Sequence, residues 1–312
     1  MEMQPHEHER RPSPRTITPL STPAALGGMG LLRFPYHQDE LRSLVRAALD
    51  EDEAFNDLTT IATVVSDRHA RGRLVSRGDG VLCGVPLAVE AFRQLDPKVT
   101  IRVDAEDGAR LKKGSNVLYL SGHARALLAA ERVALNYMQR LSGIATLTAK
   151  YVDAVKGTKA KILDTRKTTP GWRLLEKYAV RAGGGTNHRL NLAAAVLIKD
   201  NHLAAVEGDV ALAVRRARDL APVGTKIEVE CETIEQVQAA VEAKADMVMF
   251  DNMPPDVMAR GVELVAGRAI TEASGRVRLE NVRAIAEAGV DWISVGSLTH
   301  SAPALDLALD FE

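Results

Sequence analysis

The sequence has little of several features that mark particular protein classes. Of its 312 residues only two are cysteines, Cys83 and Cys231, which provide no disulfide framework and are typical of a reducing compartment. Aromatic residues make up 4% and the formal net charge is -1, so the chain has neither the stacking side chains nor the basic surface of a nucleic-acid binder. No apolar run approaches the roughly 18 residues that span a bilayer, and the N-terminus lacks the apolar segment of a secretory signal. We therefore expect a cytoplasmic protein that binds neither nucleic acid nor a membrane.

The first third of the chain is predicted to form a small α+β domain behind a disordered tail. Residues 1–30 are rich in Pro, Arg, Gly and Ser and show no hydrophobic periodicity. Residues 31–135 combine an amphipathic helical pattern with short strand-like runs that are separated by turn signals. Residues 301–312 are candidates to return to this domain. A long helical pattern runs from Ala124 to Lys156, with an interruption expected near Ser142 and Gly143.

A different pattern fills residues 136–300, where we predict an α/β barrel domain. Six apolar, strand-like runs alternate there with amphipathic helical patterns, and they read KILDT, AAVLIK, KIEVEC, DMVMF, AITEA and WISVG. This alternation is typical of a parallel sheet covered by helices. A full eight-stranded barrel usually needs about 250 residues, so we predict an incomplete barrel of about six strands. A doubly wound sheet is the alternative, although no G-x-G-x-x-G motif opens a first strand–helix turn.

Polar residues follow these strands one after another. Ligands of parallel α/β folds bind at the carboxyl ends of the strands, so the recurrence predicts a functional crevice. The residues concerned are Asp164, Thr165, Arg166, Lys167, Lys199, Asp200, Asn201, Glu228, Glu230, Glu232, Asp251, Asn252, Glu272, Ser274, Gly275, Gly296 and Ser297.

The cationic residues indicate that this crevice binds an anion. Arg166 offers a planar fork for a carboxylate or phosphate, and Lys167 offers a point charge. His188 and Arg189 follow three glycines at 183–185, whose bare backbone N–H groups are expected to contact the anion. Lys199 leaves a second interpretation open, in which a desolvated amine forms a Schiff base with a carbonyl substrate.

The acidic and small residues indicate two further functions. Glu228, Glu230 and Glu232 share one strand face, and inward carboxylates can hold a divalent cation or stabilise a developing positive centre. Asp251 can join either arrangement. The Ser-Gly and Gly-Ser pairs at 274–275 and 296–297 suit a phosphate. Together these groups fit a glycosyl transfer from an activated ribose phosphate to a carboxylate-bearing acceptor.

Several motifs resemble the quinolinate phosphoribosyltransferase family. They read ERVALNYMQRLSGIAT, DTRKTTPGWRLLEKYAVRAGGGTNHRLNL, LIKDNH, IEVE, MFDN, EASG and VGSLTHS, and the likeness runs from Leu41 to the C-terminus. The resemblance implies a pentosyltransferase that converts quinolinate and phosphoribosyl pyrophosphate, with Mg²⁺, to nicotinate mononucleotide, pyrophosphate and CO₂ in NAD synthesis. It also implies a homodimer, with higher oligomers left open.

The resemblance further implies a role for each matching residue. Arg166, Arg189 and Lys199 would hold the quinolinate carboxylates, assisted by His188, Thr165 would belong to the same binding set, and Arg132 would come from the partner subunit. Lys167 would contact the pyrophosphate, while Glu230 and Asp251 would lie near the ribose and, indirectly, its metal; these three are the expected catalytic residues. The phosphate loops would comprise Ser274, Gly275, Arg276, Val295, Gly296 and Ser297. Arg276 departs from the family pattern, which often has Gly or Asn there.

Three other functions remain open on the sequence alone. They are a Schiff-base aldolase that uses Lys199, a relative of the same fold that acts on another acid, and a sensor that binds anions without catalysis.

Overall fold

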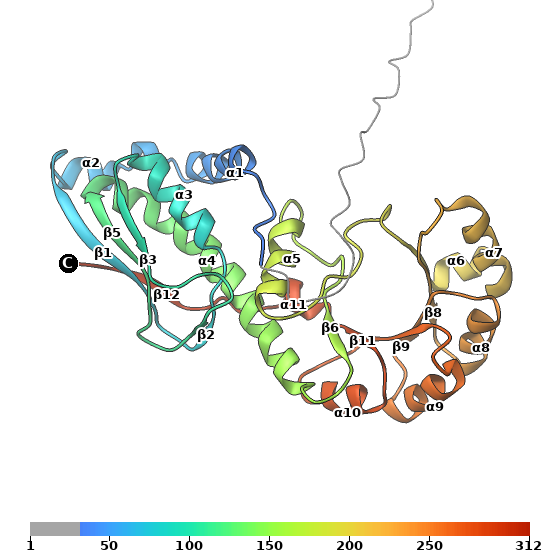
Figure 1. Cartoon of the computed structure of the whole chain (residues 1–312). Coiled ribbons are helices and arrows are strands. Elements are labelled where there is room, and N and C mark those ends of the chain that lie inside the picture. The colour runs from blue at the N-terminus through green and yellow to red at the C-terminus, as the bar shows by residue number, and fades with distance from the viewer. Residues whose placement is uncertain (1–31) are drawn as a thin grey trace, which may run out of the picture. The chain divides into compact units, whose positions relative to one another are not determined.

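The computed structural model describes residues 32–312, which form two main β-sheets with their helices (Figure 1). The tail predicted for residues 1–30 lies outside the described residues. The first sheet has four antiparallel strands in the order β12-β1-β5-β3. Their bounds are β1 His69–Ser76, β3 Thr100–Val103, β5 Asn116–His123 and β12 Leu307–Phe311, and a two-stranded sheet adds β2 Gly80–Val81 and β4 Arg110–Leu111.

The outer strand β12 is formed by the C-terminus of the chain. It pairs with β1, with Phe311 opposite Gly72 and Leu307 opposite Ser76. Residues at the end of the sequence therefore complete a sheet that begins far earlier in the chain.

Helices accompany this sheet, and their apolar residues recur on one face. The first helix, α1, buries Leu41, Val45 and Leu49 on a single stripe, as its amphipathic pattern predicts. The helices of this part are α1 Gln38–Glu51, the 3₁₀ helix η1 Ala54–Asn56, α2 Leu58–Thr63, α3 Val85–Leu95 and α4 Ala124–Ala154.

The long helix α4 is continuous, so the predicted interruption near Ser142 and Gly143 is wrong. These two residues serve packing instead. The Ser142 hydroxyl accepts a hydrogen bond from the Cys83 backbone N–H at 2.9 Å. A Cβ on Gly143 would lie 2.1 Å from the carbonyl oxygen of Pro303, so only glycine lets that segment approach the helix. The same helix packs against β5 and, further on, against β6 and α5.

The second sheet has six parallel strands in the order β6-β11-β10-β9-β8-β7. All six strands predicted from the apolar runs are present. The strands at the two ends of this order, β6 and β7, do not pair with each other, so the barrel is incomplete, as predicted. The strands are β6 Lys161–Leu163, β7 Val196–Ile198, β8 Ile227–Cys231, β9 Met247–Asp251, β10 Ile270–Ser274 and β11 Trp292–Ser294.

Helices follow each strand of this sheet, and Figure 1 shows α7 to α10 along its outer side. Their bounds are α5 Arg173–Ala182, α6 Asp200–Ala204, α7 Val210–Leu220, α8 Ile234–Glu242, α9 Pro255–Val265, α10 Val282–Glu287 and α11 Ser297–His300. Within residues 32–312, no helix has both the length and the apolar character needed to traverse a membrane.

Ion pairs close the amino ends of the strands. Asp246 accepts a hydrogen bond from the backbone N–H of Ile227 at 3.0 Å and pairs with Arg218 and Lys226. Asp291 similarly accepts from the N–H of Thr271 at 2.9 Å. A cavity of about 800 Å³ at this end contains both carboxylates, already engaged in these contacts. This end of the barrel therefore has a structural role, and the carboxyl ends are left for binding.

Candidate active site

The predicted site residues gather at one edge of the parallel sheet. Parallel strands bring their carboxyl ends to the same edge, and Ser274 at the end of β10 lies in register with Asp251 at the end of β9. Residues from all six strands contribute: Thr165, Arg166 and Lys167 follow β6, Lys199 follows β7, Glu230 lies in β8, Asp251 ends β9, Ser274 ends β10, and Gly296 and Ser297 follow β11.

A buried ion pair fixes the segment that carries His188. Asp164, which is fully buried at the end of β6, pairs with Lys177 of α5. The same carboxylate accepts hydrogen bonds from the Asn187 side-chain amide at 2.5 Å and the His188 backbone N–H at 2.9 Å. Lys177 also donates to the carbonyl oxygen of His188 at 3.2 Å. This network holds residues 187–188 against β6, and no sequence pattern predicts its contacts.

The three glycines before this segment have a packing role. Their backbone N–H groups donate to carbonyl oxygens of residues 179–181, so the prediction that they contact an anion is wrong. A Cβ on Gly183 would lie 2.3 Å from the carbonyl oxygen of Ala145 in α4. A Cβ on Gly185 would lie 2.7 Å from Val180 and 2.8 Å from Thr148. Gly184 has a φ of 87°, which favours glycine. The glycines thus let the loop pass close to α4.

Two guanidinium groups lie close enough to repel each other. Burial lowers the pKa of Arg189, and the neighbouring Arg166 lowers it further. Arg189 donates to the carbonyl oxygen of Ala195 at 2.8 Å. The buried Nε atom of Arg166 has no hydrogen-bond partner among residues 32–312. Two cations held together with an unpaired donor form a site that an anion would stabilise.

The third cation, Lys199, lies over β8, the strand whose Glu228 attracts Arg189. Its amine pairs with Glu230 of β8, while Glu228 two residues earlier attracts Arg189. Alternate residues of a strand point to one face, so Lys199 and Arg189 lie over the same face of β8. The structure therefore brings Arg166, Arg189 and Lys199 into one region.

His188 points at two buried carboxylates. Its Nε2 atom lies 3.2 Å from Glu228 Oε2 and 3.3 Å from Glu272 Oε2. Ser294 of β11 donates a hydrogen bond to Glu272 Oε1 at 2.5 Å. Burial alone lowers the pKa of His188, but the two carboxylates outweigh it and raise the pKa to about 10. Burial and the charge of Glu272 raise the pKa of Glu228 to about 7.

Lys167 lies against the loop that follows β11. A Cβ on Gly296 would lie 3.2 Å from Lys167 Cδ, so glycine makes room for the lysine stem. The Thr299 hydroxyl donates to the Lys167 carbonyl oxygen at 2.7 Å, and the Lys167 N–H donates to the Thr165 hydroxyl at 3.1 Å. These contacts place a basic side chain beside the predicted Gly-Ser phosphate loop.

The loop after β10 is shaped by left-handed backbone. Gly275 has a φ of 88°, and a Cβ there would lie 2.3 Å from the Asn252 side-chain oxygen. Arg276 has a φ of 51°, a region that favours Gly or Asn, and it is exposed. Val295 is buried and its N–H donates to the Leu163 carbonyl oxygen, so this N–H is not available to a phosphate.

Glu230 and Asp251 provide oxygens on neighbouring strands. One oxygen of Glu230 accepts from Lys199, and one oxygen of Asp251 accepts from the Asn252 amide at 2.7 Å. Both side chains are partly exposed, and hard carboxylate oxygens are ligands that Mg²⁺ accepts directly or through water. The donor set fits the ion.

Arg132 is not among the gathered side chains. It lies on an exposed face of α4, and in the described part of the chain no hydrogen bond or ion pair joins it to the strand-end residues.

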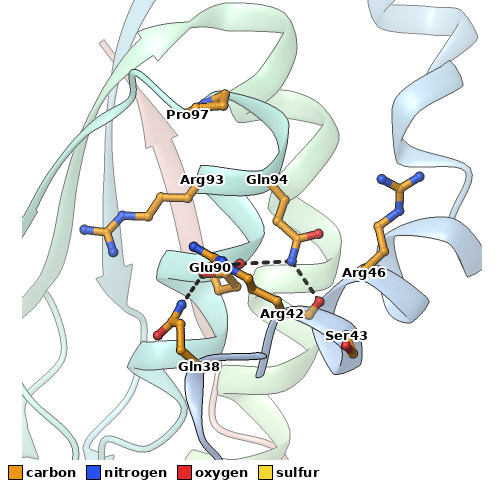
Figure 2. A pocket seen from close by; sticks show the side chains of 8 residues that line it. All are labelled: Gln38, Arg42, Ser43, Arg46, Glu90, Arg93, Gln94 and Pro97. Atoms are coloured by element: carbon orange, nitrogen blue, oxygen red, sulfur yellow. Dashed lines mark hydrogen bonds and ion pairs between the residues drawn. The ribbon is translucent and has the colours of Figure 1, made fainter. Parts of the chain in front are cut away.

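A separate cavity of about 630 Å³ lies between α1 and α3 (Figure 2). Its acidic residue, Glu90, already accepts hydrogen bonds from Gln38 at 3.2 Å and Gln94 at 3.0 Å. Figure 2 shows these three side chains joined, with Arg42 and Arg46 nearby. The cavity contains none of the strand-end residues, so it is not part of the candidate active site.

An incomplete parallel barrel with cations clustered over buried carboxylates defines an α/β-barrel protein whose site is built for an anion. Known protein families with this fold show to which of them the chain belongs. The chain belongs to the quinolinate phosphoribosyl transferase family, since its residues 57–142 match the N-terminal domain of that family and residues 144–310 match the C-terminal domain.

Curated relatives and solved structures agree with this assignment. The chain is 46% identical to the carboxylating nicotinate-nucleotide pyrophosphorylase of Mycobacterium leprae over 87% of its own length and 97% of the relative's. It is 44% identical to the probable enzyme of that name from Bacillus subtilis, over 87% and 93% of the two chains. The nicotinate-nucleotide pyrophosphorylase structure from Francisella tularensis is 39% identical, covers 89% of this chain and 98% of its own, and superposes with a TM-score of 0.83.

Proposed function

We propose that the protein transfers a phosphoribosyl group from phosphoribosyl pyrophosphate to quinolinate, and releases nicotinate mononucleotide, pyrophosphate and CO₂ in NAD synthesis. The names of the relatives support this reaction. The observation that carries it is the unpaired buried Nε of Arg166 beside Arg189 and Lys199, which lie over one face of β8. Three cations in one region suit an acceptor that carries two carboxylates.

Quinolinate is held and oriented by these cations, with His188 assisting. Arg166 supplies an unpaired buried donor, and the repulsion between Arg166 and Arg189 is relieved when a carboxylate lies between them. When Lys199 turns from Glu230 to a quinolinate carboxylate, Glu230 is released to face the ribose.

The phosphoribosyl pyrophosphate is held on the side of the site away from these cations. Lys167 contacts the pyrophosphate, and the loops at 274–276 and 296–297 hold phosphate oxygens, with Thr165 fixing the Lys167 backbone. As the bond to pyrophosphate lengthens, positive charge develops on the ribose, and Glu230 and Asp251 stabilise it. The oxygens of Glu230 and Asp251 would hold Mg²⁺ through water, and the ion would neutralise charge on the pyrophosphate.

The remaining chemistry needs little acid–base help from the protein. The pyridine nitrogen captures the ribosyl centre and becomes positively charged, which makes loss of the adjacent carboxylate as CO₂ easier. The electron pair of the broken bond stays on the ring carbon, which then takes a proton from solvent. Positioning and fixed charges therefore supply most of the catalysis.

The proposal includes a homodimer in the cytoplasm. The exposed position of Arg132 on α4 supports a role in a partner's site, since it would otherwise have no contact with the strand-end residues. Arg132 would then add a fourth cation to the carboxylate-binding set of the other subunit.

Labelled quinolinate tests the proposed reaction. With phosphoribosyl pyrophosphate and Mg²⁺, we expect one CO₂ and one pyrophosphate per nicotinate mononucleotide formed. Binding of the donor without release of pyrophosphate would indicate a sensor, and borohydride trapping of a carbonyl substrate on Lys199 would indicate an aldolase. Turnover of nicotinate without CO₂ would indicate a relative that acts on another acid. Each of these results contradicts the proposal.

A further inference from the structure

Two buried carboxylates in the site have no function in the reaction described above. Glu228 is 3% exposed and Glu272 is fully buried. One oxygen of each, Oε1 of Glu228 and Oε2 of Glu272, lacks a hydrogen bond of good geometry within residues 32–312. Isolated buried charges cost several kcal/mol, so a pair of them needs a cation nearby.

The nearest cation is the ring of His188. Its Nε2 atom faces both carboxylates, at 3.2 and 3.3 Å, and Ser294 holds the other oxygen of Glu272 at 2.5 Å. The hydrogen bond from Ser294 and the buried position leave Glu272 little freedom to turn away. The three residues come from the His188 segment, β8 and β10, so the arrangement exists only in the folded barrel.

The other charges around His188 largely cancel or are cationic. Asp164, which accepts the His188 backbone N–H, is paired with Lys177. Arg189 is the next residue and interacts with both Arg166 and Glu228. The two glutamates are therefore the groups that bias His188 toward the charged form.

We propose that Glu272 is a positioning residue that, together with Glu228, holds His188 as a doubly protonated cation facing the carboxylates of the substrate. This inference rests on the proposed function and extends it. Nε2 faces the two glutamates at 3.2 and 3.3 Å, without a hydrogen bond of good geometry to either. Within residues 32–312 no hydrogen bond involves Nδ1, and Nδ1 is not one of the buried atoms, so its N–H is available to a substrate carboxylate. The imidazolium pKa of about 10 agrees with this geometry.

A metal ion is the competing occupant. Ligand atoms of His188, Glu228 and Glu272 all lie within 4.8 Å of one another, a spacing that would suit Zn²⁺. A metal, however, requires the neutral imidazole, and it must displace a proton that two carboxylates stabilise. The charges therefore favour the proton.

The substitution Glu272→Gln keeps the shape of the side chain and removes its charge. We expect the KM for quinolinate to rise about tenfold or more at pH 8, because a charge-assisted contact contributes about 1.5–3 kcal/mol. The KM for phosphoribosyl pyrophosphate should stay within about twofold. In the variant the pKa of His188 should be lower, so the side chain should lose its proton as the pH rises. The increase in quinolinate KM should therefore shrink toward about pH 6, where an ordinary histidine is still protonated. The quinolinate KM of the unsubstituted protein should stay flat over this range, because Glu272 still faces His188 where Glu228, whose pKa is about 7, takes up a proton.

Three other variants sharpen the result. Glu263→Gln, on the exposed face of α9, is the matched control and should change nothing. Glu272→Asp should restore the flat pH profile, since it restores the charge. Ser294→Ala should change the pH dependence of the quinolinate KM in the same direction as Glu272→Gln, but by less. This variant can replace Glu272→Gln in the test if Glu272→Gln does not fold.

NMR titration of His188 in the protein without substrate tests the charge independently of activity. We expect a midpoint well above 8, assigned with a His188→Gln variant, that falls in Glu272→Gln. Any of three results would overturn the inference. The first is a midpoint near 6.5 in the unsubstituted protein, and the second is a folded Glu272→Gln variant whose KM varies with pH in the same way as that of the unsubstituted protein. The third is stoichiometric Zn²⁺ bound through Glu272. If the unsubstituted protein releases no CO₂ from quinolinate, the proposed function fails, while the titration still decides the charge of His188.

Discussion

Single residues in the site work against each other until a substrate arrives. Arg166 and Arg189 repel, and Arg166 keeps a buried donor unpaired, so these side chains hold unfavourable charge that a bound anion would offset. Sites of this kind commonly exchange stability for binding. At this scale the cations at the strand ends could be predicted because their residue types are visible in the sequence. The contact between His188 and Glu272 could not, because it depends on strand register.

Arg166→Ala tests the residue scale. We expect kcat/KM for quinolinate to fall, with a loss of about 2–5 kcal/mol of transition-state stabilisation, because a substrate carboxylate loses its buried partner. The KM for phosphoribosyl pyrophosphate should change little. The melting temperature should stay equal or rise, because the repulsion with Arg189 is gone. Arg166→Lys, which keeps the charge and loses the fork, should give an intermediate defect. Normal turnover by Arg166→Ala would contradict the assignment.

At the scale of elements, apolar runs identified all six parallel strands, since buried strands of such sheets are almost continuously apolar. Glycine was less informative. Local sequence predicts a helix break at the Ser142-Gly143 pair and an anion loop at the three glycines 183–185. These glycines instead permit close packing on α4. Gly143 lies against Pro303 and Gly183 lies against Ala145, and local sequence does not show either contact because the paired residues are far apart in the chain.

Gly143→Ala tests the packing role of α4. In an exposed helix the change would stabilise by about 1 kcal/mol. Here the added Cβ would meet the Pro303 carbonyl oxygen at 2.1 Å, so we expect a net loss of about 1–3 kcal/mol in the free energy of unfolding. Urea denaturation measures it. Gly78→Ala is the control, because the nearest atom to its Cβ would be 3.8 Å away. Equal stabilities of the two variants would argue against a packing role.

At the scale of the whole molecule, one chain accounts for most of the site but leaves Arg132 apart from it. The sequence could predict the fold class, because the pattern of strands and helices is local. It could not place α4 relative to the sheets, because those contacts join distant residues. A shared site between two subunits is the arrangement that would give Arg132 a substrate to bind.

Subunit mixing tests this arrangement. Arg132→Ala and Lys199→Ala should each be inactive alone, because each removes a cation from every site. After exchange of subunits, a mixed dimer has one site with both defects and one intact site. We therefore expect the mixture to regain up to about a quarter of normal activity, since half of the dimers are mixed at random pairing and each has one working site. If exchange is verified and activity stays absent, Arg132 does not act across subunits.

The most direct test of the central claim is a crystal structure of the protein with quinolinate. We predict that both carboxylates lie within hydrogen-bond distance of the set formed by Arg166, Arg189 and Lys199, with Lys199 turned away from Glu230. Quinolinate bound elsewhere, or bound with its carboxylates facing away from these three side chains, would contradict the account.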